Sequence, residues 1–204
     1  MRASVFVRHH SGDEMGHVGW AFESGDGRVH AGSVENHSGH FFSPSQGDGF
    51  WSAVTADPLP LMLRRQYDEL KWVDVQAPDP VAAARVVLWI KEQAYRAAFR
   101  NCEDDVYDVL RAYGVRDLPA PAWHWLPNRW FQLFRGEQAP IAQFKWPVTG
   151  PRDSAPAVDP HELTPLRPPW RRPLRVEFHL FNIARGSEAV AARFRSGRRA
   201  GSDR

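Results

Sequence analysis

The stretch GHVGWAFESGDGRVH, residues 16–30, decides the fold. Gly25-Asp26-Gly27 separates two runs of β-type composition, residues 17–24 and 28–35. An Asp-Gly pair between such runs favours a hairpin, because the turn requires positive φ angles. We therefore expect two antiparallel strands, with His17 at the start of the first and His30 on the second.

A second stretch, Asn101-Cys102 and the residues that follow, predicts a helix that begins at the cysteine and ends at Gly114. Asp79-Pro80 predicts the start of a preceding helix that runs to about residue 100. The other expected elements are a short strand around residues 5–7, a strand at 71–76, a short helix at 128–135, a strand at 174–184 and a long irregular connection over residues 36–60.

The position of Cys102 suits thiol chemistry. A cysteine in the first turn of a helix faces unpaired backbone N–H groups and the positive end of the helix dipole, which favour the thiolate and can hold an oxyanion. Glu103, Asp104 and Asp105 follow directly, and they would raise the thiol pKa if they pointed towards it.

A cysteine nucleophile needs a base, and a third polar group must orient that base. His17 and His30 are expected to be near-opposite on the hairpin, with Cβ atoms roughly 5 Å apart. This predicts His17 as the base and His30 as the residue that orients it. Glu35, Asn36 and His37 are alternative orienting residues.

Both stretches resemble the lecithin:retinol acyltransferase-like family over roughly residues 3–115. The first stretch carries a histidine, a tryptophan, a Gly-Asp-Gly turn and a second histidine, and the second carries Asn101-Cys102-Glu103. The resemblance implies the circularly permuted NlpC-type branch of the papain-like fold. This is an α+β fold in which an antiparallel sheet packs against a helix that carries the cysteine at its N-terminus.

The resemblance further implies acyl transfer through a thioester, with Cys102 as nucleophile, His17 as base and His30 as the third polar residue. Asn101 and Trp20 are expected to position the site. The substrate would be a small-molecule, peptide or lipid acyl compound, and the activity that of a peptidase, amidase or acyltransferase. A non-catalytic binding module on the same fold, and a toxin or effector with the same chemistry, are the alternatives.

Two departures from the family favour an amide or peptide over a membrane phospholipid. The acyltransferases continue Asn-Cys-Glu with His-Phe, whereas Asp104-Asp105 follow here, and this chain ends in Pro and Arg rather than in a hydrophobic anchor. The residues expected to line the substrate cleft are Glu35, Asn36, His37 and Trp51.

Composition excludes several classes of site. The single cysteine excludes an intramolecular disulfide framework and a cysteine-rich zinc site. His37 and His40 lie in a Gly-flanked loop where no helix sets their spacing, so we expect neither a metal nor a cofactor. No apolar run reaches the length of a signal peptide or a membrane span, so we expect a cytoplasmic protein.

Charge and proline are both concentrated towards the C-terminus. The formal net charge is +2, but residues 151–204 carry 11 arginines against 6 acidic residues, and nine of the 17 prolines lie in residues 140–173. This pattern does not indicate a nucleic-acid-binding domain, although the basic tail could contact a partner. We expect a catalytic domain over 1–139, a Pro-rich linker or wrap over 140–173, a strand or helix extension over 174–195 and a disordered basic tail over 196–204.

Overall fold

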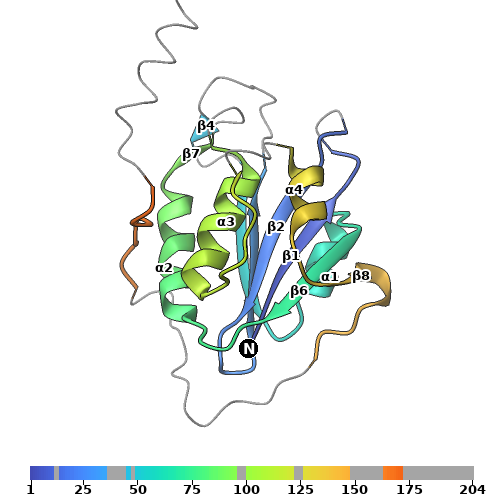
Figure 1. Cartoon of the computed structure of the whole chain (residues 1–204), viewed down its shortest axis with the longest axis horizontal. Coiled ribbons are helices and arrows are strands. Elements are labelled where there is room, and N and C mark those ends of the chain that lie inside the picture. Colours follow the sequence, from blue (N-terminus) through green and yellow to red (C-terminus); the bar gives the residue numbers. More distant parts are fainter. Residues whose placement is uncertain are drawn as a thin grey trace, which may run out of the picture. The chain divides into compact units, whose positions relative to one another are not determined.

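The computed structural model describes residues 1–11, 14–35, 45–46, 49–95, 100–121, 126–147 and 163–171. A six-stranded sheet is the centre of the fold, with the strand order β5-β3-β2-β1-β6-β8, and every adjacent pair is antiparallel (Figure 1). The strands are β1 (Arg2–Arg8), β2 (His17–Glu23), β3 (Val29–Val34), β5 (Phe50–Thr55), β6 (Glu69–Asp74) and β8 (Glu137–Pro140). The predicted α+β class with an antiparallel sheet is confirmed.

The helices cover both faces of this sheet. They are α1 (Leu59–Arg64), α2 (Pro80–Lys91), α3 (Cys102–Tyr113) and α4 (Pro127–Leu133), followed by the short 3₁₀ turn η2 (Ile141–Gln143). In Figure 1, α2 and α3 lie side by side on one face together with α4, and α1 lies behind the sheet. A small two-stranded sheet pairs β4 (Ser45–Gln46) with β7 (Ala94–Tyr95).

Strand alternation divides the interior into two hydrophobic clusters, one on each face of the sheet. Val18, Trp20 and Phe22 of β2 lie in the first cluster with the buried residues of α2, α3 and α4. Ala21 of β2 lies in the second cluster with Met62 of α1. Even-numbered residues of β2 therefore face α3, and odd-numbered residues face α1.

The predicted hairpin is confirmed, but its register is not the expected one. Its turn is closed by a hydrogen bond from Ser24 N to Arg28 O at 2.9 Å, and Gly25 and Gly27 have φ angles of 83° and 82°. This tight turn pairs Phe22 with His30.

The same register determines which residue of the neighbouring strand lies opposite His17. Trp20 pairs with Gly32, so counting three residues outward from that pair places Glu35 level with His17. The prediction that His17 and His30 are near-opposite is therefore wrong, because the turn is too short to bring them level.

Several predicted element boundaries also differ from the structure. Helix α2 ends at Lys91 rather than near residue 100, and strand β6 covers residues 69–74 rather than 71–76. The connection expected to be irregular over residues 36–60 contains β5 and the start of α1. The strand expected at 174–184 and the tail at 196–204 lie outside the described residues.

The body of the fold continues past the expected boundary at residue 139. Strand β8 spans that boundary, and Ile141 and Trp146 are buried in the second cluster. Contacts divide the chain into Met1–Pro168 and Pro169–Arg204. Within the first unit, Leu166 N donates to Arg85 O at 3.0 Å, so part of the Pro-rich segment lies against α2.

Candidate functional site

Helix α3 begins at Cys102, as predicted, and Asn101 is its N-cap. The Asn101 side-chain oxygen accepts hydrogen bonds from the backbone N–H of Glu103 at 3.0 Å and of Asp104 at 3.2 Å. In return, an Asp104 carboxylate oxygen accepts from the Asn101 N–H at 3.2 Å, which completes a capping box. Asn101 thus occupies two of the N–H groups that would otherwise face an oxyanion, and the N–H of Cys102 remains the nearest candidate donor.

The Cys102 side chain is buried in the first cluster, and its exposed fraction is 2%. Burial raises the pKa of the thiol to about 12, and the carboxyl groups of Glu103 and Asp105 act in the same direction. A hydrogen bond from the backbone of Val18 lowers that pKa in part. The thiol is therefore protonated near neutral pH in this arrangement, and its sulfur lies against the strand residue that follows His17.

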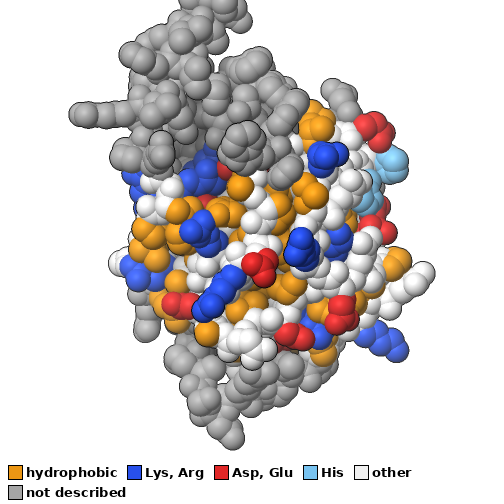
Figure 2. Space-filling view, viewed as in Figure 1, with side chains coloured by type: hydrophobic (Ala, Val, Ile, Leu, Met, Phe, Trp, Pro, Cys, Tyr) orange, Lys and Arg blue, Asp and Glu red, His pale blue; other side chains and the backbone are white. Residues whose placement is uncertain are grey.

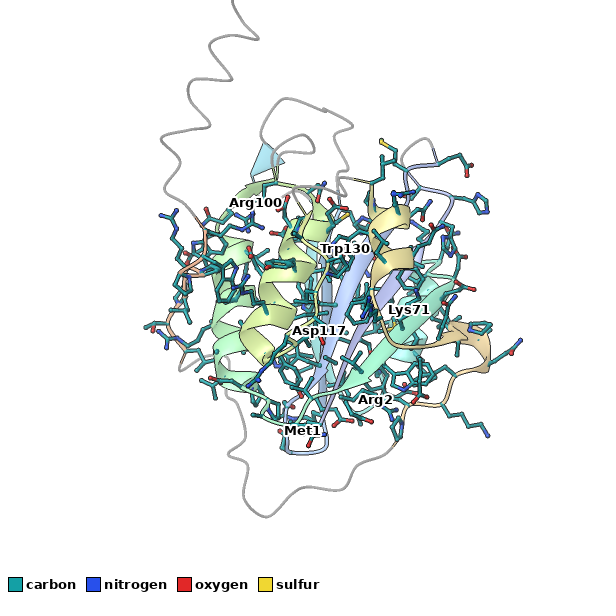
Figure 3. All side chains as sticks on the ribbon, viewed as in Figure 1. Met1, Arg2, Lys71, Arg100, Asp117 and Trp130 are labelled. Atoms are coloured by element: carbon teal, nitrogen blue, oxygen red, sulfur yellow. The ribbon has the colours of Figure 1, made fainter. Side chains whose placement is uncertain are left out.

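Acidic residues surround the start of α3. Glu103 has an exposed fraction of 1%, and its burial raises the pKa of its carboxyl to about 9. Burial also raises the pKa of Asp105 to about 6, although Arg100 donates to one Asp105 oxygen at 2.7 and 3.0 Å. Figure 3 shows Arg100 at this end of the helix. These groups disfavour a thiolate in the resting protein.

His17 lies on the other face of the sheet from Cys102. Its Nε2 is 2.7 Å from Ser33 Oγ, and its ring centroid is 5.9 Å from that of Tyr67, a residue of the second cluster. The imidazole and the thiol therefore flank the first residues of β2. The structure brings the two predicted partners to the same strand, but it does not pair them directly.

His30 does not contact this region. Its ring packs against that of Phe22, with the two ring centroids 5.0 Å apart. The Phe22 centroid in turn lies 5.1 Å from that of Tyr113, the last residue of α3. Cys102 is the first residue of this 12-residue helix, so the two ends are about 16 Å apart at 1.5 Å per residue. The prediction that His30 orients His17 is not supported by this placement. Burial lowers the pKa of His30 to about 4, so its ring is neutral.

Two of the four predicted cleft residues lie close to His17. Trp51 is directly opposite Ser33 on β5, and the Arg65 guanidinium lies 4.5 Å from the Trp51 ring. Glu35 lies between Arg8 and Arg65, with N–O distances of 3.7 and 3.6 Å. Asn36 and His37, the other two predicted residues, lie outside the described part of the chain.

Three buried polar atoms around His17 have no hydrogen-bond partner among the described residues: Glu35 Oε1, Trp51 Nε1 and Tyr67 Oη. Burial is the main cause of the raised pKa of Tyr67. The side chains of Ser33 and Trp51, which lie near the Tyr67 hydroxyl, offset part of this rise in pKa. Buried polar groups are usually satisfied, so these three atoms show that the polar side chains around His17 are incompletely satisfied.

Sequence reasoning missed Ser33 and Tyr67. Ser33 could have been found by fixing the register from the Gly-Asp-Gly turn, because strand parity then places Ser33 and His17 on one face. No local signal identifies Tyr67, which reaches the site from the turn after α1. Trp20, predicted to position the site, is fully buried in the first cluster and fills the space above Gly32.

Comparisons with protein-family models, with curated proteins and with solved structures found no match for this chain. Among the described residues, no group of three or more His, Cys, Asp or Glu side chains could hold a metal ion. The same part of the chain contains no helix with the length and apolar character needed to cross a membrane. On the face shown in Figure 2, the described basic and acidic side chains are interspersed among apolar ones.

Proposed function

We propose that this chain is a cysteine-dependent acyl-transfer enzyme, an amidase or peptidase on a permuted papain-like fold, with Cys102 as its nucleophile. One observation carries the proposal. Cys102 opens α3, and its side chain lies against the backbone of Val18, the residue after His17. The N-terminus of a helix and the start of a strand thus bring the only thiol of the chain to the residue that follows His17.

The reaction would proceed in two steps. His17 takes the proton of Cys102 Sγ, the sulfur attacks the substrate carbonyl carbon, and the C–N bond breaks as His17 protonates the leaving amine. Water then attacks the thioester carbon, His17 accepts its proton, and the sulfur leaves with that proton restored. The backbone N–H of Cys102 would stabilise the oxyanion in both steps.

This chemistry requires a change from the resting arrangement. The thiol is protonated, and the His17 ring is turned towards Ser33. The Cys102 sulfur lies on the other face of β2 from that ring, so pairing the two groups requires movement of the first residues of β2 together with rotation of the His17 side chain. Catalytic hydrogen bonds are often long in a free enzyme and shorten when substrate binds.

Acylation by p-nitrophenyl acetate tests the proposal. Cys102 is the only cysteine, so a hydroxylamine-sensitive thioester found by intact and peptide mass must be on that residue. We expect one such acetyl group on the folded chain, none on Cys102→Ser, and slow formation on His17→Ala. His10→Ala is the matched control, because its side chain is 81% exposed on the preceding loop. The proposal is wrong if only the unfolded chain forms the thioester.

A non-catalytic binding module is the second candidate, favoured by the burial of Cys102 and the raised pKa of its thiol. In that case the sulfur acts as a small apolar group of the core. The same experiment separates the two functions, since a module would leave the folded chain without a thioester at any reagent concentration that preserves the fold.

A further inference from the structure

We infer that Ser33 is the positioning residue that orients His17 and sets which ring nitrogen carries the proton. This inference deepens the proposed function and rests on it only for the role of His17 as base. Ser33 is fully buried on β3, next to the strand that carries the histidine. Its Oγ is 2.7 Å from His17 Nε2 and 3.0 Å from Val18 O.

The count of protons decides the direction of these two hydrogen bonds. A serine hydroxyl has one proton and two lone pairs. Ser33 donates its proton to the carbonyl of Val18, which can only accept. The short contact to His17 must then run from the imidazole to the hydroxyl, so neutral His17 carries its proton on Nε2.

The consequence is that Nδ1 holds the basic lone pair of the ring. Nδ1 is also the ring nitrogen closer to the main chain, because only Cγ and Cβ separate it from Cα. The main chain of the next residue, Val18, is where Cys102 makes its contact. Ser33 therefore fixes the tautomer of His17 and holds its ring in the resting position, on the face of β2 opposite Cys102.

Among the described residues, three other polar side chains are candidates for this role. His30 stacks on Phe22 on the opposite face of the sheet. Glu35, which is level with His17, lies instead between the guanidinium groups of Arg8 and Arg65. The ring of Tyr67 packs against the imidazole, and its hydroxyl lies near Ser33 and Trp51.

Nitrogen-15 NMR of the histidine-labelled full chain tests the inference, with the His17 signals assigned by their loss in His17→Gln. At a pH where the ring is neutral, we expect a protonated Nε2 and an unprotonated Nδ1. Ser33→Ala should move both signals towards the average of the two tautomers, and Ser33→Thr should restore them. Ser4→Ala is the matched control, because Ser4 is an equally buried strand serine whose hydroxyl has no hydrogen-bond partner in the described part of the chain.

A protonated Nδ1 in the unmodified chain, or an identical His17 pattern in Ser33→Ala, would overturn the inference. If the unmodified chain forms no thioester, the enzyme proposal fails, and the NMR result alone decides the role of Ser33.

Discussion

Cys102 and His17 lie on opposite sides of the same strand. The thiol lies against the backbone of Val18 on the face of the sheet that α3 covers. The imidazole is hydrogen-bonded to Ser33 on the face that α1 covers. The N-terminal end of α3 therefore lies next to the first residues of β2, and the backbone of β2 separates the two reactive groups. Burial keeps the thiol protonated in this arrangement, in which the His17 ring lies on the other face of the sheet.

The thiol of the folded chain should react slowly with iodoacetamide. A pKa of about 12 leaves about a thousandfold less thiolate at pH 8 than an ordinary cysteine has. We expect the alkylation rate, followed by intact mass, to be lower by about that factor than in the chain unfolded by guanidinium. Equal rates in the two states would show that the thiol is accessible and unperturbed.

Glu103→Gln should stabilise the protein near neutral pH. The raised pKa of Glu103, about 9, means that the unfolded carboxyl loses its proton first, so stability falls as pH rises from about 4.5 to 9. Replacing this buried acid with an amide of the same size should raise the free energy of unfolding by about 3 kcal/mol at pH 7. Urea denaturation at pH 4 and pH 7 measures the difference, which should vanish at pH 4. Exposed Glu92→Gln is the control.

His30→Phe should protect the protein against acid. The pKa of His30 is lowered to about 4, so its stabilising contribution is present above about 6.5 and is lost as pH falls towards 4. At pH 5 the unfolded imidazole binds a proton that the folded one does not, which costs about 2 kcal/mol. Phenylalanine preserves the stack on Phe22 and does not titrate. Thermal unfolding at pH 5 and pH 8 should show a gain at pH 5 only, and an equal shift at both would contradict this explanation.

Lys71→Met should destabilise the C-terminal end of α4. The Lys71 ammonium donates to the carbonyls of Phe131, Gln132 and Phe134 at 3.0 to 3.2 Å, and Figure 3 shows it on β6. Its loss leaves these helix-end acceptors unsatisfied, which should lower the free energy of unfolding by about 2 kcal/mol. Chemical denaturation measures the change. Lys91→Met replaces an exposed lysine at the end of α2 and should change the free energy of unfolding little. A similar loss of stability in both variants would argue against a specific contribution from Lys71.

The sequence was informative where structure is local. The Gly-Asp-Gly turn predicted the hairpin, and Asn101-Cys102 predicted the start of α3, because both depend on residues that are close in the chain. Register was not predicted correctly, although one residue of shift decides which face a side chain occupies. His30 was therefore assigned to the wrong place, and Ser33 was overlooked.

The second cluster could not be predicted because its members are distant in the sequence. It contains Arg8 of β1, Trp51 of β5 and Tyr67 of the turn after α1. These three residues come together only when the six-stranded sheet has assembled. Strand β8, which closes one edge of the sheet, has the polar sequence Glu-Gln-Ala-Pro and no apolar alternation that would indicate a strand. Such contacts arise from tertiary packing rather than from local propensity.

The central place of β2 in the sheet has a dynamic consequence. Because β1 and β3 both pair with it, a sliding movement of β2 would break two ladders of backbone hydrogen bonds. A movement that brings His17 to Cys102 is then confined to the first residues of β2, before Trp20, where the pairing with β3 begins. Relaxation-dispersion measurements should detect exchange at His17 while the amides from Trp20 to Glu23 remain unaffected.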